Sequence, residues 1–352
     1  MKIEAWIREH VPLEVATSAE LRYERMIWQA AEALPWVHRP ADPARPFDWV
    51  DGAQIGAFLA TLGDARRVLD LGTGDGWPGL PLARHLPQIV ALDPSPRRAD
   101  LARDNAQRLG LTNVDVVCAP AEALPFPDGS FDGVVSATAI EQCTDPLAAL
   151  GEAFRVLRPG GRFAATFEDL SAELRSPVEE TAELYLDGEV AVYRLVHRSL
   201  QPLREAEYEL RFRASAALRR AAEAVPPVPT FRATAGEPGL RPVSPEDPVL
   251  GIPLLDAARG ELLSGRFFEL THRTPDETVA LIERAGFTSI KAYGNITRTA
   301  RTFFLSLREG GLLGDLAPHM DAIARAFGRL YPGVSVGGTS VFFLVAGKPA
   351  MP

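Results

Sequence analysis

Short apolar runs, stopped by glycine or polar residues, recur along the middle of the chain. Five of them lie at residues 67–71, 88–92, 114–118, 132–135 and 162–167. Continuous apolar runs of this length are typical of strands buried on both faces of a parallel sheet. The segments between them predict helices, so the pattern indicates βα units in a doubly wound α/β sheet with right-handed crossovers.

Two of the intervening helices have clear ends in the sequence. One is predicted from residue 96 to 109, because Pro96 suits a first helical turn and Gly110 follows the last one. The other is predicted over 146–157, with Asp145 as its N-cap. This punctuation supports alternating strands and helices.

The regular alternation stops after residue 169. Residues 170–272 contain charged segments that we predict to be helical, including 199–223, and a proline-rich stretch from 226 to 253. The alternation then resumes with a helix at 274–285, a strand at 288–296 and a final apolar strand at 338–346. We therefore expect an N-terminal helical cap (1–60), a nucleotide-binding core (61–169), a large helical insertion acting as a substrate lid (170–272) and the completion of the sheet (273–352).

Composition and charge narrow the function classes. The 352 residues carry a net charge of -9, which disfavours nucleic acid as a partner because an acidic surface repels phosphates. The two cysteines and six histidines lie at spacings that suit neither a disulfide framework nor a metal site. The charged first fifteen residues do not resemble a signal peptide, and no apolar run is long enough to span a bilayer. We expect a cytoplasmic protein without metal.

A glycine-rich turn follows the first predicted strand. In VLDLGTGDGWPGLPLA, glycines 72, 74 and 76 allow positive φ and close approach of a ligand to the backbone. Asp93, at the end of the second strand, is placed to bind the two hydroxyls of a ribose. Gly74, Gly76 and Gly79 also match GxGxxG, so NAD is one candidate. Asp70, directly before the turn, favours a ligand with a cationic amino acid part.

Four blocks in order extend this picture: VLDLGTGDG, ALDPSPRRADLARDNA, AEALPFPDGSFDGVV and EAFRVLRPGGRF. With them, residues 68 to about 168 resemble the class I S-adenosylmethionine-dependent methyltransferases, in particular the small-molecule branch of methyltransferase type 11. THRTPDETVALIERAGF is similar to the last crossover of that family. The resemblance implies a Rossmann-like sheet of seven strands, mostly parallel with the last strand antiparallel, and S-adenosylmethionine as cofactor.

The resemblance also implies a set of cofactor contacts. At the matching positions these are Asp70, Gly72, Thr73, Gly74, Gly76, Asp93, Pro94, Pro120, Ala121, Glu122 and Ala137. Within this set Asp70 and the turn would hold the methionine part, Asp93 the ribose, and Pro94 would flank the adenine. The sequence departs from the family at Pro120, where an acidic residue often reaches the adenine amino group. The amide of Ala121 or the carboxylate of Glu122 are the alternatives.

Methyl transfer needs alignment of the acceptor, and a base only when the acceptor must lose a proton. Glu141 and Gln142 occupy the segment that faces the transferable methyl group in the family, so Glu141 is a candidate base or hydrogen-bond partner in the acceptor pocket. The leading hypothesis is a methyltransferase that acts on a small molecule by in-line displacement. A catalytically inactive binding or scaffold protein with the same fold, or a nicotinamide-dependent oxidoreductase, are the alternatives.

Overall fold

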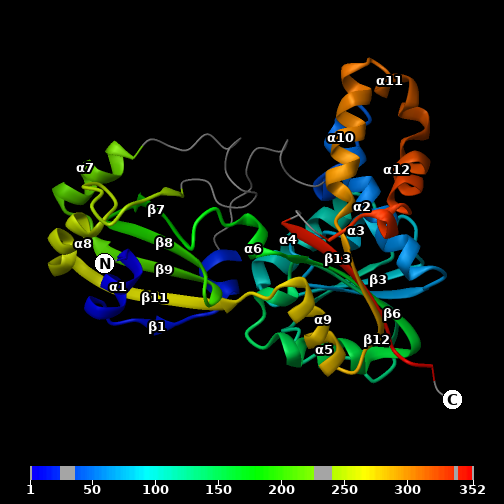
Figure 1. The fold of residues 1–352 in the computed structure, drawn as a ribbon, viewed down its shortest axis with the longest axis horizontal. Coiled ribbons are helices and arrows are strands. Elements are labelled where there is room, and N and C mark those ends of the chain that lie inside the picture. The colour runs from blue at the N-terminus through cyan, green and yellow to red at the C-terminus, as the bar shows by residue number, and fades with distance from the viewer. Residues whose placement is uncertain (1, 24–35, 226–239, 337–339, 351–352) are drawn as a thin grey trace. The chain divides into compact units, whose positions relative to one another are not determined.

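The computed structural model describes residues 2–23, 36–225, 240–336 and 340–350. The chain divides into two compact units. One unit, Pro35–Ala172 with Arg273–Pro352, contains a seven-stranded sheet, and the other, Met1–Leu34 with Glu173–His272, contains a six-stranded sheet. Figure 1 shows the elements of both units.

The seven-stranded sheet has the order β12-β13-β6-β5-β2-β3-β4. Its strands are β2 (Arg67–Leu71), β3 (Gln88–Asp93), β4 (Val114–Cys118), β5 (Phe131–Ala137), β6 (Leu157–Glu168), β12 (Thr288–Gly294) and β13 (Val341–Gly347). Neighbouring strands from β4 to β6 run parallel, whereas β13 runs antiparallel between β6 and β12. This confirms the predicted mostly parallel sheet with an antiparallel last strand.

Helices cover both faces of this sheet. They include α2 (Pro46–Leu62), α3 (Gly79–Ala83), α4 (Pro96–Arg108), α5 (Pro146–Val156) and α9 (Pro275–Arg284). Val68 packs with α2 in one apolar cluster, while the next residue, Leu69, packs with α5 and α9 in another. Because successive side chains of a strand point to opposite faces, strands buried on both faces need continuous apolar runs. The doubly wound architecture follows directly from those runs.

A helical hairpin separates β12 from β13. It is formed by α10 (Ile296–Glu309), α11 (Leu313–Leu316) and α12 (Met320–Gly328), which Figure 1 shows as a pair of long helices joined by a short one. The hairpin packs on α2 at very close range, because a Cβ atom on Gly52 would lie 2.8 Å from Ala324 and one on Gly56 would lie 2.7 Å from the Arg325 backbone.

The predicted helical insertion is wrong, because residues 173–272 form mainly an antiparallel sheet. Its strands are β7 (Val178–Asp187), β8 (Val190–Leu200), β9 (Leu203–Arg213) and β11 (Leu262–Thr271), with β10 (Arg241–Pro242) and β1 (Glu14–Val15) at the edges. Short helices α6 (Leu170–Glu173), α7 (Ala216–Ala224) and α8 (Ile252–Ala258) complete the segment. Only the last part of the predicted helix 199–223 is helical.

The alternation within β9 explains the error. Ala206, Tyr208 and Leu210 lie in the apolar core, whereas Glu205 and Glu207, at alternate positions, are also buried but paired with arginines. Charged residues at every second position predict a solvent-exposed face, so from its composition this strand resembles a polar helix. In the folded chain the glutamates are buried because arginines neutralise them, so these positions do not need to be apolar.

The first sixty residues do not form a single cap. Helix α1 (Ile3–His10) packs in the apolar core of the six-stranded unit, through Ile3, Trp6 and Ile7. Helix α2 belongs to the seven-stranded unit instead. Residues 24–35 of the predicted cap lie outside the described residues.

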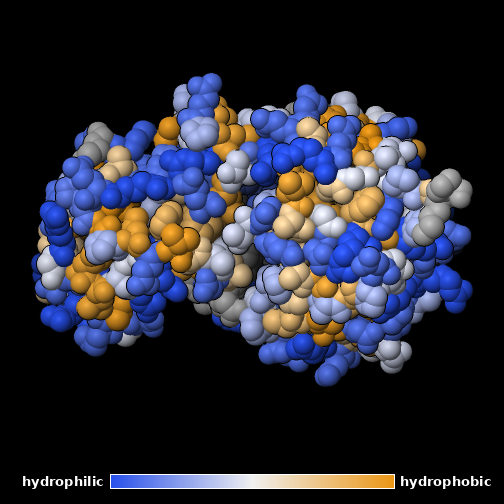
Figure 2. All heavy atoms as spheres, turned by 90° about the horizontal axis from the view of Figure 1, so that it is seen from below, coloured by the Kyte–Doolittle hydropathy of each residue, from blue (hydrophilic) through white to orange (hydrophobic). Residues whose placement is uncertain are grey.

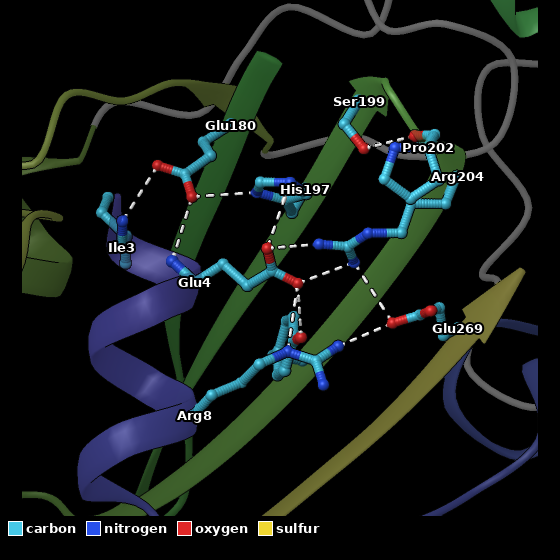
Figure 3. A network of polar contacts seen from close by, with 10 residues as sticks. Ile3, Glu4, Arg8, Glu180, His197, Ser199, Pro202, Arg204 and Glu269 are labelled. Atoms are coloured by element: carbon cyan, nitrogen blue, oxygen red, sulfur yellow. Dashed lines mark hydrogen bonds and ion pairs between the residues drawn. The ribbon is translucent and has the colours of Figure 1, made fainter. Parts of the chain in front are cut away.

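A buried polar network fixes α1 on its sheet (Figure 3). The Glu4 carboxylate accepts two hydrogen bonds from Arg204, at 2.8 and 2.7 Å, and one from the Tyr208 hydroxyl at 2.7 Å. The His197 ring lies between two carboxylates, with Nε2 3.1 Å from Glu4 and Nδ1 3.1 Å from Glu180. Glu180 also accepts the backbone N–H groups of Ile3 and Glu4, which begin the helix. Every oxygen of Glu4 is therefore satisfied.

Some large apolar side chains lie on the surface instead of in the cores. Figure 2 shows hydrophobic residues in groups bordered by hydrophilic ones. Val15, Leu263, Leu312 and Leu330 are among the exposed large apolar side chains. None of the helices in the described parts of the chain has the length and apolarity that crossing a bilayer would require.

Glu4→Gln tests the network. Burial alone would raise the pKa of Glu4, but hydrogen bonds from Arg204 and Tyr208 and the charge of His197 lower it from 4.5 to about 2. Removing one partner of a buried ion pair costs roughly 3 kcal/mol, so we expect faster amide hydrogen exchange over residues 3–11 and a lower free energy of unfolding. Because the pKa is lowered, the contribution is present above pH 4.5 and lost as the pH falls toward 2. Glu9→Gln, on the exposed face of the same helix, is the control; equal effects of both variants would contradict the assignment.

Candidate functional site

The carboxyl ends of the parallel strands place the predicted turns at one edge of the sheet. After β2 the backbone makes a tight turn in which Gly72, Gly74 and Gly76 have φ angles of +71°, +57° and +118°. The amides of Gly72 and Thr73 donate to the Leu92 carbonyl of β3 at 2.8 and 2.9 Å. Positive φ favours glycine, so the positive φ angles that the tight turn requires at these three positions explain why glycine recurs at this spacing.

Asp93, at the end of β3, connects this turn to the next loop. One carboxylate oxygen accepts the amide of Gly74 and the other accepts the amide of Ser95, both at 2.9 Å. The structure brings Asp93 and the glycine turn together, as the sequence predicts, and gives Asp93 a structural role as well.

Asp70 lies beneath the turn and is fully buried. Its Oδ2 accepts the amide of Gly79, at the start of α3, at 2.9 Å. Its Oδ1 is also buried and has no hydrogen-bond partner among the described residues. Burial raises the pKa of Asp70 from 3.8 to about 7, against the opposing effects of the Thr73 side chain and the Gly79 amide, and the charges of Asp93 and Asp75 add to the rise. A bare, buried carboxylate oxygen is suited to a cationic donor such as an ammonium group.

The remaining predicted cofactor contacts lie at the same edge. Pro94 and Pro120 are exposed, Ala121 is buried, and Ala137 is partly buried at the end of β5. Glu122 is already engaged, since its Oε1 accepts the amides of Thr144 and Asp145 at 2.9 and 3.3 Å. The carboxylate of Glu122 therefore joins two loops. A role toward an adenine ring stays a prediction.

Glu141 lies in the short 3₁₀ turn η3 (Ile140–Gln142) that follows β5. The turn touches the glycine loop, because a methyl group built on Gly72 would overlap the Cβ atom of Ala139. Oε1 of Glu141 accepts the amide of Glu168 at the end of β6, at 2.9 Å. Oε2 is buried and has no hydrogen-bond partner within the described chain. Burial and the charge of Glu168 raise the pKa of Glu141 from 4.5 to about 8.

Two residues that the sequence analysis missed also shape the site. Asn105, fully buried in α4, donates from Nδ2 to the carbonyl of Asp75 at 2.9 Å and so holds the far side of the glycine turn. Burial raises the pKa of Asp75 to about 6, and the charge of Arg98 opposes that shift. The sequence does contain a signal for Asn105, because it is an amide side chain on the inner face of a helix made otherwise of small and charged residues. No cluster of three or more His, Cys, Asp or Glu with the geometry of a metal site occurs in the described chain.

Comparison with known proteins identifies this region. Residues 69–165 match the family described as "Methyltransferase domain". The chain is 44% identical over 99 residues to a demethylmenaquinone methyltransferase of Thermus thermophilus, a match that spans 28% of this chain and 44% of that protein. It is 41% identical over 100 residues to a ubiquinone/menaquinone biosynthesis C-methyltransferase of Geobacter sulfurreducens, across 27% of this chain and 39% of that protein. The matched segments therefore cover less than half of each relative.

A solved structure resembles the chain over more of its length. The CcbJ methyltransferase from Streptomyces caelestis aligns with 95% of this chain and 97% of its own, at 15% sequence identity and a TM-score of 0.49.

Gly72→Ala tests the packing of the turn against η3, with Gly110→Ala as the matched control. Both positions have positive φ, +71° and +66°, so both variants lose roughly 1 kcal/mol from backbone strain. Only Gly72 has a neighbour in the way, since no described atom lies within 4 Å of a Cβ built on Gly110. Urea unfolding should show a clearly larger loss of stability for Gly72→Ala, and equal losses would refute the close contact.

Proposed function

We propose that this chain, which matches the methyltransferase domain family over residues 69–165, is a class I S-adenosylmethionine-dependent methyltransferase and transfers a methyl group from S-adenosylmethionine to a small-molecule acceptor. The observation that carries the proposal is the buried Asp70 carboxylate, which has one unsatisfied oxygen beneath a turn of positive-φ glycines. This arrangement suits the amino acid part of the cofactor.

Three parts of the cofactor have candidate partners among the described residues. Asp70 would bind the ammonium group, the backbone of the Gly72–Gly76 turn would border the methionine chain, and Asp93 would accept hydrogen bonds from the ribose. When bound, S-adenosylmethionine supplies a methyl group on a positively charged sulfur. The protein must then exclude water and hold the acceptor in line with that methyl group.

The acceptor is proposed to be a small molecule. The relatives named above are methyltransferases of menaquinone and ubiquinone biosynthesis, and the net charge of -9 disfavours a nucleic acid. The role of residues 170–272 as a substrate lid, which the sequence suggests, stays a prediction. So does a catalytic role for Glu141.

Two other functions were open from the sequence, and neither is favoured. A nicotinamide-dependent oxidoreductase does not explain the bare oxygen of Asp70, because a dinucleotide has no ammonium group to place there. A scaffold protein that has lost the cofactor would gain nothing from keeping that oxygen unsatisfied. Calorimetry with S-adenosylmethionine, S-adenosylhomocysteine and NAD separates the three. Binding of NAD alone would overturn the proposal, and binding of the first two with no turnover on any acceptor would favour the scaffold.

Asp70→Asn tests the cofactor site itself. We expect calorimetry to show S-adenosylhomocysteine bound roughly 10- to 100-fold more weakly, the size of a lost charged hydrogen bond. Because the pKa of Asp70 is about 7, binding to the ionised form should tighten several-fold between pH 6 and 7.5 in the unmodified protein. The variant should lose that pH dependence. Asp64→Asn, at an exposed position, should behave like the unmodified protein; a pH-dependent affinity in Asp70→Asn would exclude Asp70 as its source.

A further inference from the structure

The loops at the carboxyl edge of the seven-stranded sheet are strongly acidic. They comprise residues 70–79, 93–98, 118–124, 137–146 and 166–169, which follow β2 to β6 in turn. Their acidic residues are Asp70, Asp75, Asp93, Glu122, Glu141, Asp145, Glu168 and Asp169, and their basic residues are Arg97 and Arg98. A site with this balance of charge attracts cations and repels anions.

Besides Asp70, a second side chain at this edge lacks a full set of hydrogen-bond partners. Glu141 is only 8% exposed, and its Oε1 reaches across to the amide of Glu168. Its Oε2 is buried with no partner among the described residues. A buried acceptor without a donor costs free energy, so its retention points to a donor that arrives with a ligand.

The groups around Glu141 make it a weak acid. The charge of Glu168, from β6, adds to burial in raising the pKa of Glu141 to about 8. The Cys143 thiol, in the same segment, has its own pKa raised by burial and by the charges of Glu122 and Glu141. The cation on α5, Arg155, is held by Glu152 and Asp128 at the other end of that helix. A carboxylate with a pKa near 8 is close to the best strength for a base at neutral pH.

We propose that the methyl acceptor is an amine, which binds at this edge as an ammonium ion and gives its proton to the Glu141 carboxylate. The inference rests on the proposed function and specifies its substrate class. An ammonium group is both a cation, which the acidic edge attracts, and a donor, which Oε2 of Glu141 lacks.

The proton and electron pairs balance without a further reagent. In the fraction of molecules with ionised Glu141, which grows as the pH rises toward 8, the ammonium nitrogen loses one proton to the carboxylate and regains its lone pair, so that Glu141 becomes a neutral carboxylic acid. The nitrogen lone pair then forms the bond to the methyl carbon while the sulfur–carbon bond breaks and its pair stays on sulfur. The positive charge moves from sulfur to the methylated nitrogen, and Glu141 later returns its proton to water.

Other acceptor classes fit this edge less well. A hydroquinone or phenol would have to become an anion, and the charge of Glu168 that disfavours ionisation of Glu141 would disfavour that anion too. A carboxylate or phosphate acceptor would be repelled from the start. Unlike a hydroquinone, carboxylate or phosphate, an amine carries positive charge when it arrives as an ammonium ion and again after methylation, and negative surroundings stabilise that charge.

The first test compares acceptor classes on the full-length protein. Amines, hydroquinones and carboxylates matched in size are titrated calorimetrically into protein saturated with S-adenosylhomocysteine, and turnover is followed separately as S-adenosylhomocysteine release. We expect binding and turnover with members of the amine group, and amine affinity that weakens several-fold from low to high salt. Preference for hydroquinones or carboxylates, or no turnover with any amine, would overturn the proposal. Failure to bind S-adenosylhomocysteine would instead overturn the proposed function.

The second test is Glu141→Gln with Glu283→Gln, an exposed position on α9, as control. Loss of a general base should lower kcat/KM for the best amine at least 100-fold at pH 7, with S-adenosylhomocysteine affinity unchanged. Near pH 10 most of the amine is already unprotonated in solution, so the two rates should converge. A defect that persists at pH 10 would show that Glu141 only supports β6 through the Glu168 amide, and the proposal would be wrong.

Discussion

The carboxylate of Asp70, buried at the end of β2, is the constraint on which the carboxyl edge of the seven-stranded sheet depends. A carboxylate at this depth must be neutralised, paired or hydrogen-bonded, and one oxygen is met by the Gly79 amide at the start of α3. That bond requires α3 to begin directly above the strand, where a Cβ atom on Gly79 would lie 2.6 Å from the Asp70 oxygen. The tight turn between strand and helix, and the glycines that allow it, follow from the position of one charged group.

The same edge is tied together by backbone amides donated to acidic side chains. Asp93 binds amides on both sides of the β3 turn, Glu122 binds the loop after β5, and Glu141 binds the end of β6. Each of these bonds holds an irregular loop in place. Acidic side chains therefore stabilise the loops in the way that backbone pairing stabilises the strands. The cost is a concentration of negative charge, which burial converts into the raised pKa values of Asp70 and Glu141. Rigidity and proton affinity at this edge therefore have a common origin.

The central strands of the seven-stranded sheet could be predicted because they are buried on both faces and are therefore largely apolar, with Asp70 in β2 as a buried exception. Residue 68 packs on one face and residue 69 on the other, and no composition other than a continuous apolar run satisfies both. The six-stranded sheet could not, because Glu205 and Glu207 are buried by pairing with arginines that lie far away in the sequence or on a neighbouring strand. In the site, the glycines and Asp93 were predictable from spacing. The hydrogen bonds of Glu122 to the loop after β5 were not predictable, because they depend on where two loops meet in space.

Carboxylates are buried in two different ways in this chain. Glu4 has both oxygens bound by side chains, including both terminal nitrogens of Arg204, and its pKa is lowered to about 2. Asp70 and Glu141 each have one oxygen on a backbone amide and one with no partner in the described chain, and their pKa values are raised to about 7 and about 8. An arrangement selected only for stability would complete the second oxygen, as it does at Glu4, because an unsatisfied buried acceptor costs roughly 1–3 kcal/mol. The two incomplete carboxylates lie at the same edge of the same sheet, the edge where we propose that ligands supply the missing donors.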